Sequence, residues 1–399
     1  MSATFESALE GIKVLDLTEG RGLYAGKMLA DFGADVIKIE PPGGSAARQI
    51  PPFKDDIPGL ENSLYFANFN TNKRSIILNL DKAAGRDIFQ RLVTESDAVI
   101  EDFPPGTLKD RGLDYPILHK VNPKLIMASV TAFGPDGPYS HFAANDMVSF
   151  AAGGIMHGSG AEKEPPVVAP DEQAYQAASI TAVYGILSAL FLRWRTGEGQ
   201  LVGISNHEVI ESFSQGIMRY SVTSSLGGRS GSQFWAAPAR IYPCKDGYVH
   251  LLVFYPQHWR AFLELLDNPE TLTDKMWYDA GFRAKNRDLI DPMTEQYTAT
   301  RTKDEITRAC QARGIPCTPV NTPADNARNE HFIQRGSFTQ IEHPVLGKHM
   351  LLAPPYRMSE TPGMIRRPAP LLGQHNREVF SGLGYTQEEM ERLKTDGVI

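Results

Sequence analysis

Residues 12–39 read IKVLDLTEGRGLYAGKMLADFGADVIKI, and this stretch decides the fold class of the chain. Ile12–Thr18 is a short, largely β-branched and leucine run that predicts a buried strand, and Asp35–Ile39 predicts a second one. Between them, Gly22–Gly33 combines small residues with apolar positions at helical spacing and ends on glycine, which predicts a helix. Because strand, helix and strand in this order form a right-handed crossover, we expect the two strands to be parallel.

The alternation of strands and helices continues along the next hundred residues. After a loop rich in proline and glycine, the pattern predicts a strand from Ser75, a helix over Ala83–Thr94, and strands at Ala98–Ile100 and Leu125–Val130. Alternation at this spacing is typical of a doubly wound α/β sheet. The first turn reads EGRGLYAG and lacks the GxGxxG fingerprint, which argues against a nicotinamide or flavin cofactor.

Composition limits the class of protein further. A length of 399 residues predicts two domains, or one large domain with an insertion. A net charge of −7 disfavours nucleic acid and anionic membrane surfaces as partners, and we see no apolar run that approaches the roughly 20 residues of a membrane span. The first residues, MSATFESALEG, show no signal-peptide pattern, and the three cysteines lack metal-ligand spacing. We therefore expect a cytoplasmic protein without a metal site.

A long helix is predicted in the middle of the chain. Pro170 followed by Asp171 and Glu172 suits its start, and Arg195 followed by Gly197 suits its end. Residues that recur three and four positions apart predict one buried face, namely Ser179, Val183, Ile186, Leu187, Leu190 and Trp194.

Several motifs spread along the chain together resemble family III CoA-transferases. They are LEGIKVLDLT, GADVIKIEPPGG, FNTNKRSIILNL, DFPPGTLKDRGLDY, SVTAFGPDGPYS and RTGEGQLVGIS. The resemblance implies a Rossmann-like large domain with a parallel sheet over residues 1–226, a smaller α+β domain over 227–325, and a C-terminal return to the large domain over 326–399. It also implies an interlocked dimer and two substrates, a CoA thioester such as succinyl-CoA and a carboxylic acid, with no metal and no nicotinamide.

The same resemblance assigns CoA binding to particular positions. They are Arg21, Gly22, Asn70, Thr71, Asn72, Lys73, Asp102, Phe103, Arg111, Ala132 and Phe133. The lysine of the Asn70–Lys73 loop is expected beside the CoA phosphates. Asp102 departs from the asparagine of the family and places a carboxylate near a polyanion. Arg111 lies one position past the usual arginine, which turns a helical side chain by about 100°.

The position of the family's nucleophilic aspartate holds Tyr175. Counting ten residues back from Gly185, or forward from Pro165 and Pro166 by the family's spacing, leads to the same residue. The nearest acids, Asp171 and Glu172, lie about one helical turn earlier, or roughly 6 Å. The family's mobile glycine-rich loop also has no counterpart in residues 227–239, where Phe234 and Trp235 occupy the expected tip.

The family's chemistry requires a carboxylate at that position. The carboxylate attacks the acyl-CoA thioester and gives a mixed anhydride and the CoA thiolate. The thiolate then attacks the anhydride, which releases the donor acid and leaves CoA on the enzyme as a thioester that the acceptor acid attacks. A phenol, with a pKa of about 10, is largely protonated at neutral pH and is a poor carrier of acyl groups.

Four functions remain open from the sequence. The chain is either the CoA-binding subunit of a heteromer, like the subunit of benzylsuccinate CoA-transferases that lacks the aspartate, or a homodimer in which Asp171 or Glu172 attacks. A third function, the α-methylacyl-CoA racemase activity of the same family, needs a histidine before Asp146 and an acid at Tyr175. Asn145 stands before Asp146, so both proton-transfer groups are missing. A non-enzymatic CoA-binding protein is the fourth.

Overall fold

A computed structural model describes residues 6–229, 231 and 235–399, and Phe234 lies outside this range. The chain divides into two compact units. Unit 1 contains the chain up to Met156, Val168–Ser225 and Ile333–Ile399, and unit 2 contains His157–Val167 and Leu226–Phe332. The short segment 157–167 therefore joins unit 2, although it precedes the long central helix in the sequence.

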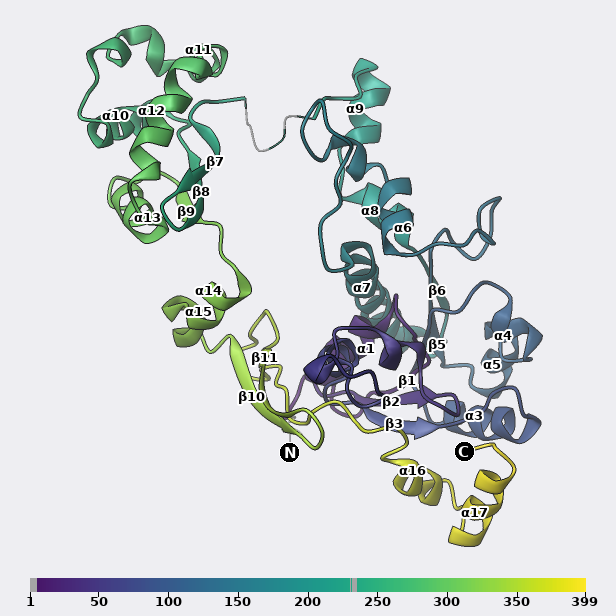
Figure 1. The fold of residues 1–399 in the computed structure, drawn as a ribbon. Coiled ribbons are helices and arrows are strands. Elements are labelled where there is room, and N and C mark those ends of the chain that lie inside the picture. The colour runs from purple at the N-terminus through teal and green to yellow at the C-terminus, as the bar shows by residue number, and fades with distance from the viewer. Residues whose placement is uncertain (1–5, 230, 232–234) are drawn as a thin grey trace. The chain divides into compact units, whose positions relative to one another are not determined.

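Unit 1 is built on a six-stranded parallel sheet in the order β3-β2-β1-β4-β5-β6 (Figure 1). The strands are β1 (Lys13–Asp16), β2 (Asp35–Glu40), β3 (Arg74–Ile77), β4 (Ala98–Glu101), β5 (Ile126–Thr131) and β6 (Leu201–Ser205). The strand order reverses between β1 and β4, as in dinucleotide-binding folds. The predicted doubly wound sheet and its parallel first crossover are confirmed.

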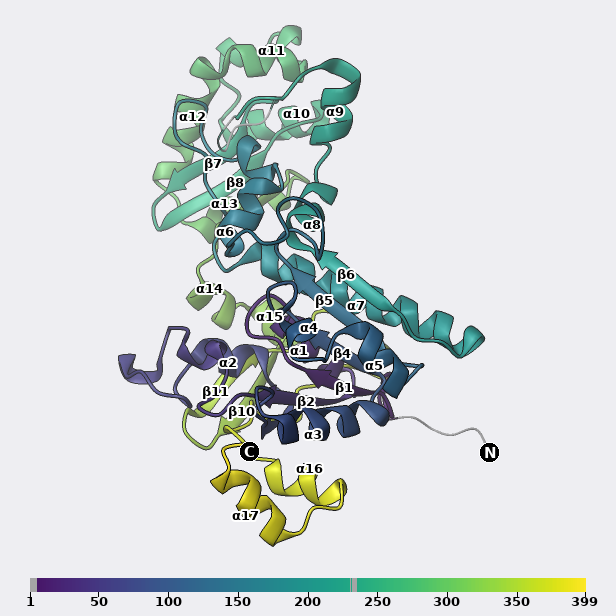
Figure 2. The same ribbon diagram turned by 90° about the vertical axis from the view of Figure 1, so that its right-hand side faces the viewer.

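Helices cover both faces of the sheet. The helices of unit 1 are α1 (Leu23–Asp31), α2 (Leu64–Phe69), α3 (Ala83–Thr94), α4 (Thr107–Asp110), α5 (Tyr115–Val121), α6 (Asp146–Ala152), α7 (Gln173–Thr196), α8 (Asn206–Ser212), α9 (Gly216–Thr223), α16 (Asn376–Gly382) and α17 (Gln387–Thr395). One apolar core joins α1, α7 and α8 to one face of the strands, and a second joins α3, α5, α16 and α17 to the other. Figure 2 labels these helices. The C-terminal helices thus belong to the core of unit 1.

The long helix α7 begins at Gln173, two residues later than the proline and acids suggested. Its buried face is mostly alanine, with Ala174, Ala178 and Ala182 all inaccessible to solvent, because α1 and β5 approach closely there. The prediction of a buried face through Leu187 and Trp194 is wrong at these two residues, which are 37% and 71% exposed. Helical periodicity identifies apolar residues that share one face of a helix, but α7 is apolar on two faces. The face with the smaller side chains is the one that packs inward.

Unit 2 has a core of its own. A three-stranded antiparallel sheet, in the order β7-β8-β9, packs on helices around a buried tryptophan, Trp259. The elements are β7 (Ala239–Cys244), β8 (Gly247–Leu252), β9 (Cys317–Pro319), α10 (Pro256–Leu265), α11 (Ala280–Lys285), α12 (Arg287–Ala299), α13 (Lys303–Gln311) and α14 (Pro323–Arg328). Unit 2 is thus a small α+β unit, in agreement with the predicted fold class. A further helix, α15 (Glu330–Gln334), spans the boundary between the units and leads into a hairpin of β10 (Phe338–His343) and β11 (Gly347–Leu352), which belongs to unit 1.

One helix of the described residues, α7, is long and apolar enough to cross a membrane by length and composition alone. That is weak evidence, because the core helix of a water-soluble protein meets the same criterion. Its alanine face packs against β5 and β6 in the parallel sheet, so we treat α7 as a structural helix of unit 1.

Candidate functional site

The carboxyl ends of β1 and β4 meet where the strand order reverses, which is where open α/β sheets bind ligands. Asp102 follows β4 directly, and its carboxylate turns toward the loop after β1. It accepts hydrogen bonds from the main-chain N–H groups of Glu19 at 2.7 Å, Gly20 at 2.8 Å and Gly22 at 3.3 Å. Gly22 has to be glycine here, because an added Cβ would lie 2.5 Å from a methyl carbon of Thr18. Asp102 therefore fixes the β1–α1 loop.

Arg21 projects from the loop that Asp102 holds. Its guanidinium donates to the main-chain oxygen of Asp102 at 3.3 Å and to that of Ala144 at 2.7 Å. It lies over the ring of Tyr175, 5.6 Å from the ring centre. The main-chain oxygen of Arg21 accepts a hydrogen bond from the Ser179 hydroxyl at 2.9 Å, which ties the loop to α7. The structure thus brings three sequence-predicted residues together: Arg21, Asp102 and Tyr175.

Tyr175 lies in the first turn of α7 and is half-buried. Its main-chain N–H donates to the Asp146 carboxylate at 2.9 Å, so an acid from α6 caps the helix that carries the tyrosine. Burial raises the pKa of the phenol above its ordinary value, and although Arg21 opposes this, the charges of Glu172 and Asp146 add to it. The phenol is therefore neutral at physiological pH and is no substitute for a carboxylate.

The two acids before α7 adopt an unusual backbone conformation. Asp171 and Glu172 have φ values of 65° and 52°, in the left-handed region that non-glycine residues adopt at a cost of about 1 kcal/mol or more. Glu172 accepts a hydrogen bond from the Tyr65 hydroxyl at 2.5 Å, and burial together with this carboxylate raises the pKa of Tyr65. Asp171 is exposed. The acids therefore lie before the helix, and neither side chain caps it.

Both acids line a large cavity of unit 1. It has a volume of about 830 Å³ and lies among the loop before α2, the start of α7 and the β10–β11 hairpin. Its wall is mostly apolar, with Ile50, Leu64 and Met350 among the lining residues, and Lys54 and His349 add polar groups. Asp171 also borders a neighbouring hollow of about 350 Å³ beside α1.

The Asn70–Lys73 loop, which was predicted to contact CoA, is buried throughout. The Lys73 ammonium binds the Asp16 carboxylate at 2.7 Å, the main-chain oxygen of Leu23 at 3.0 Å and the Asn70 side chain at 2.9 Å. Gly26 in α1 makes room for this pair, because an added Cβ would lie 2.3 Å from the carboxylate.

Because these three partners use all the donors of an ammonium group, Lys73 faces the protein interior in this structure. Burial lowers the pKa of Lys73 to about 8 although Asp16 opposes it. Thr71 and Asn72 are held in the same way, by Lys27 at 2.6 Å and by Asp31 at 2.6 Å. The contact of Lys73 with CoA phosphates remains a prediction.

The other predicted CoA contacts are spread along the same sheet edge. Phe103 follows Asp102, and the Arg111 guanidinium lies 5.6 Å from its ring centre while pairing with Asp81 at 2.9 Å. Ala132 and Phe133 follow β5, and the Phe133 ring lies 5.3 Å from His207. Phe133 and His207 border a hollow of about 310 Å³.

Sequence reasoning missed two residues that shape this site. Asp146 had entered only as a position of the racemase pattern, yet it caps α7 beside Tyr175. Its position in sequence gave no such signal, because the two helices meet only in the fold. Tyr65 bonds to Glu172 across more than a hundred residues, and nothing near it in the sequence indicated that contact.

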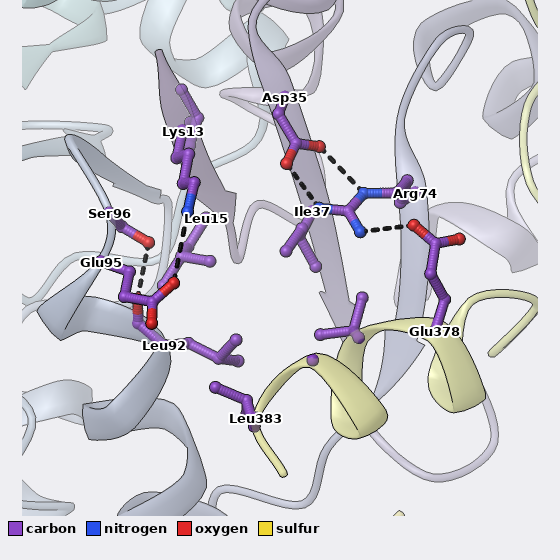
Figure 3. Close-up of a pocket in the computed structure, with 13 residues that line it drawn as sticks. Lys13, Leu15, Asp35, Ile37, Arg74, Leu92, Glu95, Ser96, Glu378 and Leu383 are labelled. Carbon is purple, nitrogen blue, oxygen red and sulfur yellow. Dashed lines mark hydrogen bonds and ion pairs between the residues drawn. The ribbon is translucent and has the colours of Figure 1, made fainter. Parts of the chain in front are cut away.

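Another pocket of unit 1 lies at the opposite edge of the sheet (Figure 3). It is formed at the amino ends of β1, β2 and β3, where parallel sheets do not bind their ligands. Its charges pair with one another: Arg74 binds Asp35 at 2.5 Å and Glu378 at 2.8 Å, and Lys13 binds Glu95 at 3.2 Å. The Arg74–Glu378 ion pair fastens α16 to the sheet, and we assign this pocket no ligand. Within the described residues, no group of three or more histidine, cysteine or acidic side chains could hold a metal ion.

Comparison with known proteins gives a consistent result. Residues 9–376 match the family model "CoA-transferase family III". The chain is 33% identical to the formyl-CoA:oxalate CoA-transferase of Streptomyces avermitilis, over 98% of this chain and 99% of that protein. It is 31% identical to the succinyl-CoA:(R)-benzylsuccinate CoA-transferase subunit BbsE of Thauera aromatica, over 97% of each. A solved structure of a CaiB/BaiF family protein from Brucella suis superposes with a TM-score of 0.87 at 31% identity, covering 95% of this chain and 100% of that one.

Proposed function

We propose, from the premise that this chain belongs to CoA-transferase family III, that it is the CoA-binding subunit of a heteromeric transferase whose paralogous partner supplies the nucleophilic aspartate. The family makes the protein a CoA-transferase that acts on CoA thioesters. The proposal adds a donor such as succinyl-CoA, an acceptor carboxylic acid and a division of labour between two chains.

The observation that carries the proposal is Tyr175. It stands where the count along the chain places the nucleophile, beside Arg21 and at the carboxyl edge of the sheet. Its phenol has a raised pKa and remains protonated, whereas the transfer cycle requires a carboxylate that attacks and later leaves. We infer that the site keeps the residues around the reacting carbonyl but lacks the carboxylate that would accept the acyl group.

Two relatives support the division of labour by their names. BbsE is named as a subunit, and a Chloroflexus aurantiacus protein, 31% identical over 98% of this chain, is named the alpha subunit of a succinyl-CoA–L-malate CoA-transferase. Both names also contain succinyl-CoA, which supports a dicarboxylic acyl donor for this chain.

We further propose an interlocked dimer with a second family III chain, which the surface of α7 supports. Ile180, Tyr184, Phe191 and Trp194 form an apolar stripe on α7, and each is more than half exposed in the single chain. A stripe of this size on an isolated chain is typical of an interface. The measurement is the molar mass in solution by light scattering. We expect the Phe191→Glu variant to have the molar mass of a monomer. A wild-type chain that is monomeric both alone and with its paralogue would refute the proposed dimer.

A homodimer with its own nucleophile is the second candidate, and one observation favours it. Asp171 is exposed on the wall of the 830 Å³ cavity, and Glu172 lines the same cavity. A carboxylate in that position has room for a thioester beside it. Glu172 is the less suitable of the two, because its hydrogen bond to Tyr65 withdraws negative charge from the attacking oxygen.

Transfer assays separate the two candidates. The purified chain is incubated with succinyl-CoA and a panel of carboxylic acids, alone and with its paralogue, and hydroxylamine is added to cleave enzyme-bound anhydrides or thioesters. We expect no transfer and no hydroxamate on the chain alone. Transfer by the isolated chain, with a hydroxamate mass shift on Asp171 or Glu172 that disappears in the matching Asn or Gln variant, would establish the homodimer and refute the subunit model.

A further inference from the structure

Arg21 carries a positive charge for which the described part of the chain offers no ion-pair partner. Among the residues that the structure describes, its guanidinium donates to two main-chain oxygens, those of Asp102 and Ala144. Its Nε–H group is buried and has no hydrogen-bond partner within the described residues. Because a guanidinium has five N–H donors in a planar fork suited to carboxylates, the described residues supply acceptors for only part of the donor set of Arg21.

The carboxylates near Arg21 are already satisfied by other donors. Asp102 accepts three main-chain N–H groups of the β1–α1 loop. Asp146 accepts the N–H of Tyr175 at the start of α7, and Glu172 accepts the Tyr65 hydroxyl. Each negative charge therefore has its own hydrogen bonds, and the Arg21 charge remains for a ligand.

The position of Arg21 indicates which part of an acyl-CoA it meets. It lies over Tyr175, the position at which the family's nucleophile attacks the thioester carbonyl. The acyl group, and not the distant phosphates of the nucleotide, occupies that neighbourhood. An anion next to the thioester is the free carboxylate of an acyl group derived from a dicarboxylic acid.

We propose that Arg21 binds the free carboxylate of a dicarboxylic acyl group carried on CoA and so makes this chain selective for such thioesters. The inference rests on the proposed function, because it presumes that the chain binds CoA thioesters in this site. It differs from the expectation that Arg21 contacts the CoA moiety itself, which stays a prediction that the same experiment tests.

The test is calorimetric titration of the purified chain, in its native assembly, with CoA, butyryl-CoA and succinyl-CoA. Butyryl and succinyl groups have the same four-carbon length and differ in the terminal carboxylate. We expect succinyl-CoA to bind about 10- to 100-fold more tightly than butyryl-CoA, which corresponds to about 1.4–2.8 kcal/mol. In Arg21→Gln this difference should disappear while CoA and butyryl-CoA keep their affinities, and Arg21→Lys should restore part of it.

Arg301 offers a matched control. It lies in unit 2, is half-buried, donates to the main-chain oxygen of Tyr297 at 2.8 Å, and its guanidinium lies 4.0 Å from the centre of that tyrosine ring. Arg301→Gln should leave all three affinities unchanged.

Three outcomes would overturn the inference. Equal affinity of the wild-type chain for butyryl-CoA and succinyl-CoA refutes it without any variant, even if Arg21→Gln fails to fold. An equal loss of affinity for all three ligands in Arg21→Gln would show that Arg21 contacts the CoA moiety and not the acyl group. Failure of the wild-type chain to bind any of the three refutes the proposed function itself.

Discussion

Removing the Asp102 carboxylate tests whether this residue holds the β1–α1 loop or contacts CoA. Asp102 is 3% exposed, and its carboxylate accepts hydrogen bonds from three main-chain N–H groups. Hydrogen bonds to a charged group contribute about 1.5–3 kcal/mol each, but part of this returns when the freed N–H groups bind water. We therefore expect Asp102→Ala to lower the free energy of unfolding by about 3 kcal/mol. Asp102→Asn keeps one accepting oxygen but turns an NH₂ group toward a main-chain donor, which costs about 1–2 kcal/mol.

The assay is urea and thermal unfolding followed by tryptophan fluorescence, with CoA affinity measured on the same samples. A loss of 3 kcal/mol corresponds to about 6 °C in the midpoint of the transition of unit 1, at about 2 °C per kcal/mol. Asp136→Asn, in the exposed loop after β5, is the control and should leave the midpoint unchanged. The reasoning is refuted if Asp102→Asn unfolds like the wild-type chain and binds CoA more tightly, since that result would mean that the carboxylate faces and repels the CoA polyanion.

Three further predictions follow from the same structure. Tyr175→Asp should enable the isolated chain to form a hydroxylamine-cleavable adduct with succinyl-CoA, seen by mass spectrometry. Tyr175→Asn, whose side chain has the same shape as aspartate, should form none. The absence of an adduct in Tyr175→Asp would show that the surrounding site has lost its function too. Lys73→Met should lower the free energy of unfolding by about 3–5 kcal/mol, because it leaves the inaccessible Asp16 with Lys38 at 3.6 Å as its remaining cationic partner. If urea unfolding gives a free energy within about 1 kcal/mol of the wild-type value, Lys73 has no structural role of this kind. Burial raises the pKa of Glu101 to about 7 from an ordinary 4.5, so between these pH values the folded state holds a proton that the unfolded state has lost. The free energy of unfolding should therefore fall by about 3 kcal/mol as the pH rises from about 4.5 to 7, and then level off. Glu101→Gln should flatten that part of the plot of urea midpoint against pH, and an unchanged slope would mean that other groups cause it.

The sequence predicted the sheet well because its signals are local. Ile12–Thr18 and Asp35–Ile39 are apolar runs bounded by polar residues and glycine, and parallel strands buried on both faces need such runs. The motifs were local too, so family membership followed from short stretches read in order. The helices α16 and α17 share one apolar core with β3 and α3, and the domain bounds that the family resemblance implies stay a prediction.

The candidate site was less predictable, because its contacts join segments far apart in the chain. Asp102 was predicted as a CoA contact by position, but it binds a loop 80 residues earlier. Leu187 and Trp194 fit the period of the buried face of α7, yet alanines pack inward there. The period of a helix cannot say which of two apolar faces meets the sheet, since that depends on how closely α1 and β5 approach.

The amino-acid sequence alone determined the parallel sheet and the family, because residue type and spacing along single segments suffice for each. It also predicts that Tyr175 occupies the nucleophile position. Only the tertiary structure decided what surrounds that tyrosine. The capping of α7 by Asp146, the fixing of the first loop by Asp102 and the main-chain contacts of Arg21 all arise where strands β1 and β4 bring separate segments to one edge. Hydrogen bonds act over about 3 Å, so the fold determines which donors and acceptors meet.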